Sequence, residues 1–134
     1  MKIVTVPEFL LDTNIIIETF WGKEPVASLV ESWIKEGVIA MSVVTVAEIL
    51  SKANKREKEK LSLLTNKFGA FSIDITLAEI AGNYRKEFSR KKTRVYLLDC
   101  FVAATAKLYN LKLVTKNVKD YPMKDVEIID PRDY

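Results

Sequence analysis

The stretch Phe9-Leu10-Leu11-Asp12-Thr13-Asn14 leads a short apolar run directly into a carboxylate and then into two polar residues. A continuous apolar run is typical of a strand that is buried on both faces. Asp12 follows this predicted strand and is a favoured N-cap for the helix predicted over residues 13–21. The stretch therefore predicts a strand, an acid and a helix in succession, as expected at the start of an α/β fold.

The pairing of an apolar run with an acid recurs along the chain. The further pairs are Glu48 after residues 38–44, Asp99 at the start of residues 99–108, and Asp120 after residues 113–115. Loops that leave the carboxyl ends of parallel strands converge on one crevice, so distant acids can meet there. We expect a three-layer α/β fold, in which helices flank a central, mostly parallel sheet of four or five strands.

Helical periodicity connects the predicted strands. Val26, Leu29, Val30, Trp33 and Ile34 follow helical spacing between Pro25, which suits a first turn, and Gly37, a natural C-terminal cap. Further helices are expected from Thr45, from Thr76 and over residues 97–109. Residues 53–68 fit one helix or two. Strands are expected at residues 9–11, 38–44, 71–75, 113–115 and 126–129, and the tail at 130–134 is expected to be loose.

Composition narrows the class of protein. A length of 134 residues predicts a single domain over residues 1–134, and 49% hydrophobic residues suffice for a core. The single cysteine, Cys100, rules out an intrachain disulfide and fits a reducing, cytoplasmic location. No signal peptide or membrane-spanning stretch is expected. Abundant lysine without glutamine leans towards a thermophilic source, and the net charge of +3 permits a polyanionic partner.

The chain has no histidine. This excludes a Ser-His-Asp triad, a His-paired cysteine and a histidine-based zinc motif. Carboxylates without imidazole or thiolate partners suit hard divalent cations such as Mg²⁺ or Mn²⁺. Metal-assisted phosphodiester hydrolysis is the chemistry that this ligand set indicates.

Each acid also has a structural alternative. Asp12 can cap a helix, and Glu48 has capping-box spacing from Thr45, a spacing that Thr76 and Glu79 repeat. Asp99 suits the first turn of a helix, while Asn117 and Asp120 are common turn residues. Capping does not predict acids beside several strands of one sheet. Gathered carboxylates repel one another, and a bound cation is the usual reason to tolerate them.

Four segments together resemble the ordered motifs of PIN-domain nucleases. They are Leu10-Leu11-Asp12-Thr13-Asn14, Thr45-Val46-Ala47-Glu48-Ile49, Asp99-Cys100-Phe101-Val102-Ala103-Ala104-Thr105-Ala106 and Thr115-Lys116-Asn117-Val118-Lys119-Asp120-Tyr121. The compact length resembles the VapC-type toxins, the ribonuclease half of a toxin–antitoxin pair. Two departures are Cys100, where a small apolar residue is usual, and the lack of glycine at residues 91–98. We expect Cys100 to serve as a small hydrophobe.

The resemblance implies a PIN-like fold and a metal-dependent endoribonuclease whose products carry a 5′-phosphate and a 3′-hydroxyl. It implies that Asp12, Glu48 and Asp99 bind Mg²⁺ or Mn²⁺, with Asp120 as a fourth acid. Supporting or substrate-contacting roles fall to Thr13, Asn14, Thr115 and Asn117. The implied partners are an RNA substrate, an antitoxin protein and a second copy of the chain in a homodimer.

Basic and aromatic residues have open interpretations. Arg90, Lys92 and Arg94 precede Asp99, and Lys116 and Lys119 lie in the fourth motif. Contact with an RNA backbone is one interpretation, and a solvated helix end is the alternative for residues 85–94. Phe20 and Trp21 can stack on bases or receive an apolar segment of a partner, whereas Trp33 fits the core.

Three further functions stay open at this point. Within the same fold, the protein can be a processing nuclease for structured RNA or a catalytically silent module that binds nucleic acid or protein. A receiver-like α/β domain also gathers acids around Mg²⁺. The alanine-rich segment after Asp99 and the segment 115–120 fit a receiver poorly.

Overall fold

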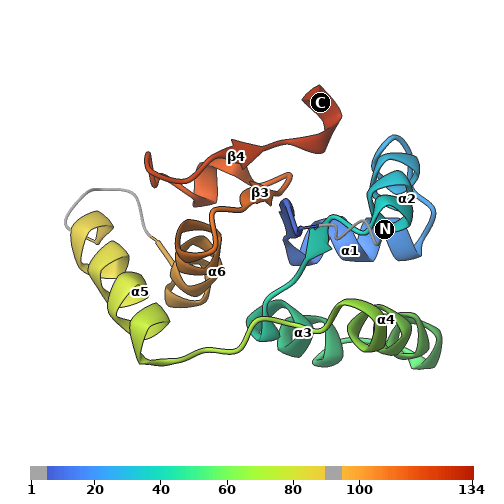
Figure 1. Ribbon diagram of the computed structural model, residues 1–134, viewed down its shortest axis with the longest axis horizontal. Coiled ribbons are helices and arrows are strands. Elements are labelled where there is room, and N and C mark those ends of the chain that lie inside the picture. Colours follow the sequence, from blue (N-terminus) through green and yellow to red (C-terminus); the bar gives the residue numbers. More distant parts are fainter. Residues whose placement is uncertain (1–5, 90–94) are drawn as a thin grey trace, which may run out of the picture.

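Four short parallel strands form the sheet in the computed structural model, which describes residues 6–89 and 95–134 (Figure 1). The strands are β1 (Phe9–Leu11), β2 (Ile39–Ala40), β3 (Lys112–Val114) and β4 (Ile128–Ile129), in the order β2-β1-β3-β4. All three pairings are parallel. β2 lies on one side of β1 and β3 on the other, so the strand order reverses at β1. The carboxyl ends of β1 and β3 therefore flank the crevice where α/β proteins bind ligands.

Helices cover both faces of the sheet, which confirms the three-layer prediction. They are α1 (Thr13–Phe20), α2 (Val26–Glu36), α3 (Val43–Leu50), α4 (Lys55–Phe68), α5 (Ile75–Phe88) and α6 (Leu97–Leu108). Phe9 and Leu11 pack with α1, α2 and α4, while Leu10 packs with α5 and α6. Successive side chains of a strand point to opposite faces, so the three apolar residues of β1 contribute to the hydrophobic cores on both sides of the sheet. Figure 1 shows the two groups of helices on either side of the strands.

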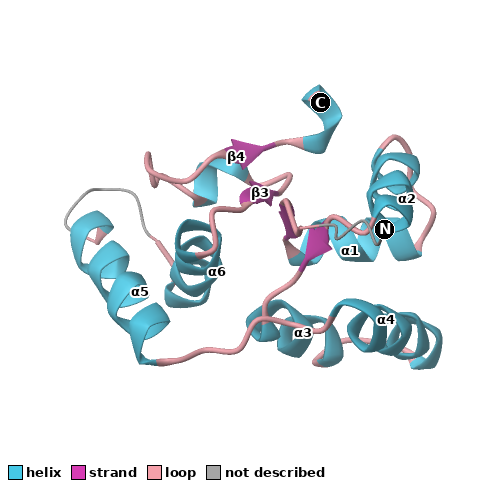
Figure 2. Ribbon diagram, in the orientation of Figure 1, coloured by secondary structure: helices cyan, strands magenta, loops and turns pink. Residues whose placement is uncertain are grey.

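The strand predicted over residues 38–44 is mostly wrong. β2 covers only Ile39–Ala40, and α3 begins at Val43, after a short connection (Figure 2). Ser42 is the N-cap and its hydroxyl accepts the Val44 N–H at 3.1 Å, so Thr45 lies inside the helix and forms no capping box. The run is apolar except for Ser42 because the start of α3 is itself largely buried. Periodicity cannot separate such a helix from a buried strand.

The strand predicted over residues 71–75 is also wrong. Phe71 forms only an isolated parallel bridge with Ser42, and α5 begins at Ile75 with Asp74 as its N-cap. Ile73 and Ile75 are exposed, so the alternation of apolar and polar residues does not mark one buried face. Thr76, which has capping-box spacing from Glu79, lies one residue inside the helix.

The structure also tests the expectations for residues 53–68, for Gly37 and for the C-terminal tail. Residues 53–68 contain one helix, α4, which Asn54 caps through a capping box with Glu57. Gly37 ends α2 in the left-handed conformation at φ 75, as predicted. The C-terminal tail is not loose: Pro131–Asp133 form a short 3-10 helix, and the Tyr134 ring meets Phe9 and Trp33 edge-on. Cys100 and Trp33 are buried in the core, as expected.

Candidate active site

Asp12 lies at the carboxyl end of β1 and is only 8% exposed. It caps α1, because its Oδ1 accepts the Thr13 N–H at 2.8 Å. Its Oδ2 accepts hydrogen bonds from the Thr115 hydroxyl at 2.9 Å and the Tyr121 hydroxyl at 3.0 Å. The register of β1 and β3 pairs Leu11 with Val114, so Asp12 and Thr115 come next on adjacent strands. Capping therefore accounts for one oxygen of Asp12, and the fourth motif holds the other.

Asp99 faces Asp12 across the Tyr121 hydroxyl. Asp99 lies in the first turn of α6, and the Tyr121 hydroxyl lies 3.4 Å from its Oδ1. Burial, followed by the charges of Asp12, Asp120 and Glu48, raises the pKa of Asp99 to about 6. Burial, followed by the charges of Asp12 and Asp99, raises the pKa of Tyr121, so its hydroxyl stays protonated. The site thus brings the charges of Asp12, Glu48 and Asp120 within range of Asp99.

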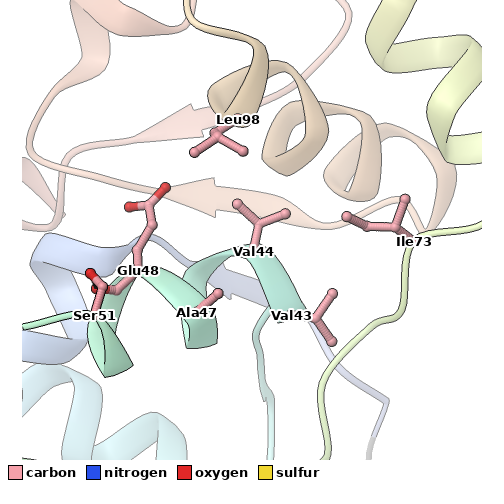
Figure 3. Close-up of a pocket in the computed structure, with 7 residues that line it drawn as sticks. All are labelled: Val43, Val44, Ala47, Glu48, Ser51, Ile73 and Leu98. Atoms are coloured by element: carbon pink, nitrogen blue, oxygen red, sulfur yellow. Dashed lines mark hydrogen bonds between the residues drawn. The ribbon is translucent and has the colours of Figure 1, made fainter. Parts of the chain in front are cut away.

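Glu48 approaches the site from α3. Its Oε2 accepts a hydrogen bond from the Thr13 hydroxyl at 2.9 Å, which links α3 to the start of α1. Glu48 also lines an otherwise largely apolar pocket of about 600 Å³ that reaches Leu98, the residue before Asp99. Figure 3 shows the Glu48 carboxylate extending from α3 towards Leu98 on α6. The charge of Glu48 is also among those that raise the pKa of Asp99, after burial and the charges of Asp12 and Asp120.

The polar residues of the first and fourth motifs form a connected network. The Asn14 Nδ2 donates to the Thr115 hydroxyl at 3.3 Å, and its Oδ1 accepts the Lys116 N–H at 3.1 Å. Asn117 contributes its main-chain N–H to the Thr115 hydroxyl at 3.1 Å, while the residue itself is exposed. Asp120 is half-buried at the end of the 3-10 helix Val118–Asp120. Thr13, Asn14 and Thr115 thus contact the acids directly or through one side chain.

The donor set fits a hard divalent cation in chemistry and in charge. Carboxylate oxygens are its preferred ligands, and burial together with neighbouring negative charges raises the pKa of Asp99. As the side chains stand, no three acidic or cysteine side chains of the described residues are close enough together to hold an ion. The Tyr121 hydroxyl occupies the gap between Asp12 and Asp99, and Glu48 is bound to Thr13. For an ion to bind, the carboxylate side chains would have to rotate towards one another.

The basic and aromatic residues that were candidates for contact with RNA or a partner differ in their surroundings. Lys116 forms an ion pair with the buried Glu18, whereas Lys119 is exposed. Arg90, Lys92 and Arg94 lie outside the described residues. Trp21 is 66% exposed, and its indole N–H donates to Glu57 at 3.0 Å. Phe20 is half-buried.

The sequence alone does not single out the Tyr121 hydroxyl or the buried carboxylate of Glu18. Tyr121 appeared only as the aromatic residue of the fourth motif, and no role was predicted for its hydroxyl. Glu18 lies three residues after Ile15, on the buried side of α1. An acid on the buried face of an amphipathic helix requires a partner, and this is the signal that could have identified Glu18.

Parallel strands with acids gathered at their carboxyl ends define an α/β protein whose site is suited to metal-assisted chemistry. The chain belongs to the PIN domain family, whose model matches residues 9–126. The ribonuclease VapC10 of Mycobacterium tuberculosis is 30% identical to it over 114 residues, which cover 85% of this chain and 86% of the relative. The tRNA(fMet)-specific endonuclease VapC of Shigella flexneri is 28% identical and covers 85% of this chain and 89% of its own.

Solved structures give the same fold. A toxin–antitoxin complex from Klebsiella pneumoniae matches with a TM-score of 0.75 and 28% identity, over 92% of this chain and 98% of that chain. VapBC2 from Rickettsia felis, bound to a promoter DNA fragment, matches with a TM-score of 0.76 and 22% identity, over 93% and 98% of the two chains. At 22% identity, this second match supports the fold alone. Membership of the PIN family leaves the receiver-like alternative without support.

Proposed function

We propose that this protein is a divalent-metal-dependent endoribonuclease that hydrolyses RNA phosphodiester bonds as the toxin of a toxin–antitoxin pair. The observation that carries the proposal is the approach of Asp12 and Asp99, from β1 and α6, to one hydroxyl group. Relatives that bear the names ribonuclease VapC10 and tRNA(fMet)-specific endonuclease VapC support RNA as the substrate class. The toxin–antitoxin complex from Klebsiella pneumoniae supports an antitoxin as partner.

Asp12, Glu48 and Asp99 would hold the ion through carboxylate oxygens, with Asp120 as a fourth acid. We favour Mg²⁺ or Mn²⁺ as this ion because all the donors are hard oxygens. A bound ion supplies Lewis acidity that activates water and neutralises charge on the phosphate oxygens. The chain's own polar residues orient the acids: Thr115 and Tyr121 donate to Asp12, and Thr13 donates to Glu48.

RNA selectivity must arise in binding, because the 2′-hydroxyl is not the nucleophile of this reaction. Lys119 is the exposed basic residue nearest in sequence to Asp120, and Arg90, Lys92 and Arg94 remain candidates from the sequence. A homodimer and a cytoplasmic location complete the proposal. The described residues contain no helix long and apolar enough to cross a membrane.

A pair of matched aspartates separates catalysis from helix capping. Asp12 caps α1, and Asp74 caps α5 by accepting the Leu77 N–H at 2.9 Å. Asparagine is an equally good cap, so both Asp12→Asn and Asp74→Asn should fold. We expect Asp12→Asn to abolish cleavage of end-labelled RNA in Mg²⁺ or Mn²⁺, and Asp74→Asn to cut like the wild type. A folded Asp12→Asn protein that still cuts would refute the site.

A further inference from the structure

Glu18 is a buried carboxylate outside the acid cluster. It lies near the end of α1 and is only 8% exposed. A buried carboxylate is tolerated only when it is paired. Its Oε2 lies 2.8 Å from the Lys116 Nζ, and its Oε1 lies 3.9 Å from the Lys23 Nζ. The Lys23 side chain is 59% exposed and that of Lys116 is 22% exposed. Lys116 is therefore the principal partner.

Lys116 is also fixed through its main chain. Its N–H donates to the Asn14 Oδ1 at 3.1 Å, at the start of α1. Its carbonyl accepts from the Arg132 Nη2 at 3.4 Å, in the C-terminal segment. Both ends of α1 thus contact the same residue, one through Asn14 and the other through Glu18. This arrangement fixes Lys116 against α1 with the side chain and the main chain together.

The residue that precedes Lys116 belongs to the site. The Thr115 hydroxyl donates to the Asp12 Oδ2 at 2.9 Å and is fully buried. Because the two residues are adjacent in the chain, a shift of the Lys116 main chain would displace the hydrogen-bond donor of Asp12. The ammonium of Lys116 is meanwhile engaged by Glu18.

We propose that Glu18 is a positioning residue of the nuclease site: it anchors Lys116, and with it the loop at residues 115–117 that orients Asp12. This inference rests on the proposed function. It assigns Lys116 to anchoring the loop, in place of the contact with RNA phosphates that its sequence position suggests. Thr115 is a hydrogen-bond partner of Asp12, and such partners of metal-binding carboxylates contribute to metal affinity, so a displacement of Thr115 is measurable at the metal site itself.

The chain offers a matched control pair. The Lys112 Nζ lies 2.8 Å from the Glu8 Oε1, the same separation as in the Glu18–Lys116 pair. Glu8 and Lys112 join β1 to β3 at the amino ends of the strands, away from Asp12, and both side chains are well exposed. An exposed pair contributes little to stability. Glu8→Gln therefore removes the same type of contact without affecting the site.

The test measures the affinity of the purified protein for Mn²⁺, by electron paramagnetic resonance, together with RNA cleavage kinetics. We expect Glu18→Gln to weaken Mn²⁺ binding by up to about tenfold, because it acts on Asp12 through Thr115, and to lower kcat while the KM for RNA stays unchanged. Glu8→Gln should match the wild type in all three quantities. Lys116→Arg, which can keep the ion pair, should stay near the wild type. Unchanged Mn²⁺ affinity in a folded Glu18→Gln protein would overturn the proposal.

A double variant keeps the test valid if the single variant does not fold. Glu18→Gln leaves Lys116 partly buried without its main partner, whereas Glu18→Gln with Lys116→Met leaves no unpaired charge at this contact. We expect the double variant to bind Mn²⁺ more weakly than the wild type, because the loop has lost its anchor whether one residue of the pair is changed or both. Mn²⁺ affinity at the wild-type level in the double variant would overturn the proposal.

RNA binding in EDTA separates anchoring from phosphate contact. If Lys116 is an anchor, Lys116→Met leaves the salt dependence of RNA affinity unchanged. A phosphate contact would lower the salt slope by about one unit, and that result would overturn the assignment.

The same measurements distinguish failure of the proposed function from failure of the proposed role of Glu18. A wild-type protein that binds Mn²⁺ without cutting any RNA refutes the nuclease, while the Mn²⁺ comparison still decides the role of Glu18. A wild-type protein that binds no Mn²⁺ refutes both.

Discussion

At the scale of one residue, the raised pKa of Asp99 shows that the acid cluster lowers the stability of the metal-free protein at neutral pH. This pKa rises from 3.8 to about 6, first through burial and then through the other acids. The folded state therefore retains a proton that the unfolded state releases. The free energy of unfolding of the metal-free protein should fall as pH rises from about 4 to about 6, and this penalty should then stay constant.

Asp99→Asn should remove that fall. Because Asp99 is only half-buried, we expect the variant to gain about 1 kcal/mol at neutral pH after solvent screening is allowed for. Urea unfolding in EDTA, on either side of the titration, measures the difference. Asp74→Asn, at an exposed cap, should leave the pH dependence as in the wild type. Equal pH dependence in Asp99→Asn and the wild type would contradict the clustering of charges.

Tyr121 provides a second prediction at this scale. Tyr121→Phe removes the hydroxyl that lies between Asp12 and Asp99, while Thr115 still donates to Asp12. We expect the metal-free protein to lose about 1–2 kcal/mol in urea unfolding, because a hydrogen bond to a charged group is lost. Tyr109→Phe, at an exposed ring stacked on Phe71, is the control and should change little. An equal loss in both variants would remove the special role of Tyr121.

The individual acids were predictable from sequence, because each follows an apolar run or opens one. The hydroxyl of Tyr121 was not, because its partners Asp12 and Asp99 are 109 and 22 residues away in sequence. The pairing of Glu18 with Lys116 depends in the same way on how β3 lies against α1. Such contacts follow from tertiary structure, which local patterns do not encode.

At the scale of the element, α3 carries Glu48 into the site, and its N-cap should affect both stability and metal binding. Ser42→Ala should cost about 1 kcal/mol in unfolding and weaken Mn²⁺ affinity. Asn54→Ala, at the cap of α4, should cost a similar amount of stability without changing Mn²⁺ affinity, because α4 carries none of the four acids. Urea unfolding and Mn²⁺ titration of both variants provide the comparison. Weaker Mn²⁺ binding in Asn54→Ala alone would show that α3 is not the element that matters.

The elements that were mispredicted share a physical cause. Residues 38–44 are apolar except for Ser42, because β2 and the start of α3 are both largely buried, and one small polar residue did not reveal the boundary although it is the N-cap of α3. Residues 71–75 alternate without forming a strand, because Ile73 and Ile75 are exposed. Helices with a clear apolar stripe, such as α2 and α6, were predicted to within a residue or two.

At the scale of the whole molecule, the strand order β2-β1-β3-β4 brings the acids together. The alternation of strands and helices predicted a parallel α/β sheet, but not which strands are neighbours. Once β1 lies between β2 and β3, the acid after β1, the helix after β2 and the loop after β3 meet at one end of the sheet. The acids at Asp99 and Asp120 then complete the cluster.

This arrangement predicts an electrostatic effect on RNA binding. Without a divalent ion, the acid cluster should repel phosphates even though the whole chain has a net charge of +3. Asp99→Asn should therefore bind RNA several times more tightly than the wild type in EDTA, as measured by fluorescence anisotropy. Asp74→Asn serves as the charge-matched control. If RNA affinity increased equally in both variants, the change in net charge alone would explain the effect.

Cleavage of a mixed set of labelled single-stranded and structured RNAs tests the central claim most directly. The assay compares Mg²⁺, Mn²⁺ and EDTA, with wild-type, Asp99→Asn and Asp74→Asn proteins side by side. The acid cluster predicts cutting that requires a divalent ion, is lost in Asp99→Asn and is kept in Asp74→Asn. Cutting that persists in EDTA or in folded Asp99→Asn protein, or a wild-type protein that cuts none of the RNAs with either ion, would contradict it.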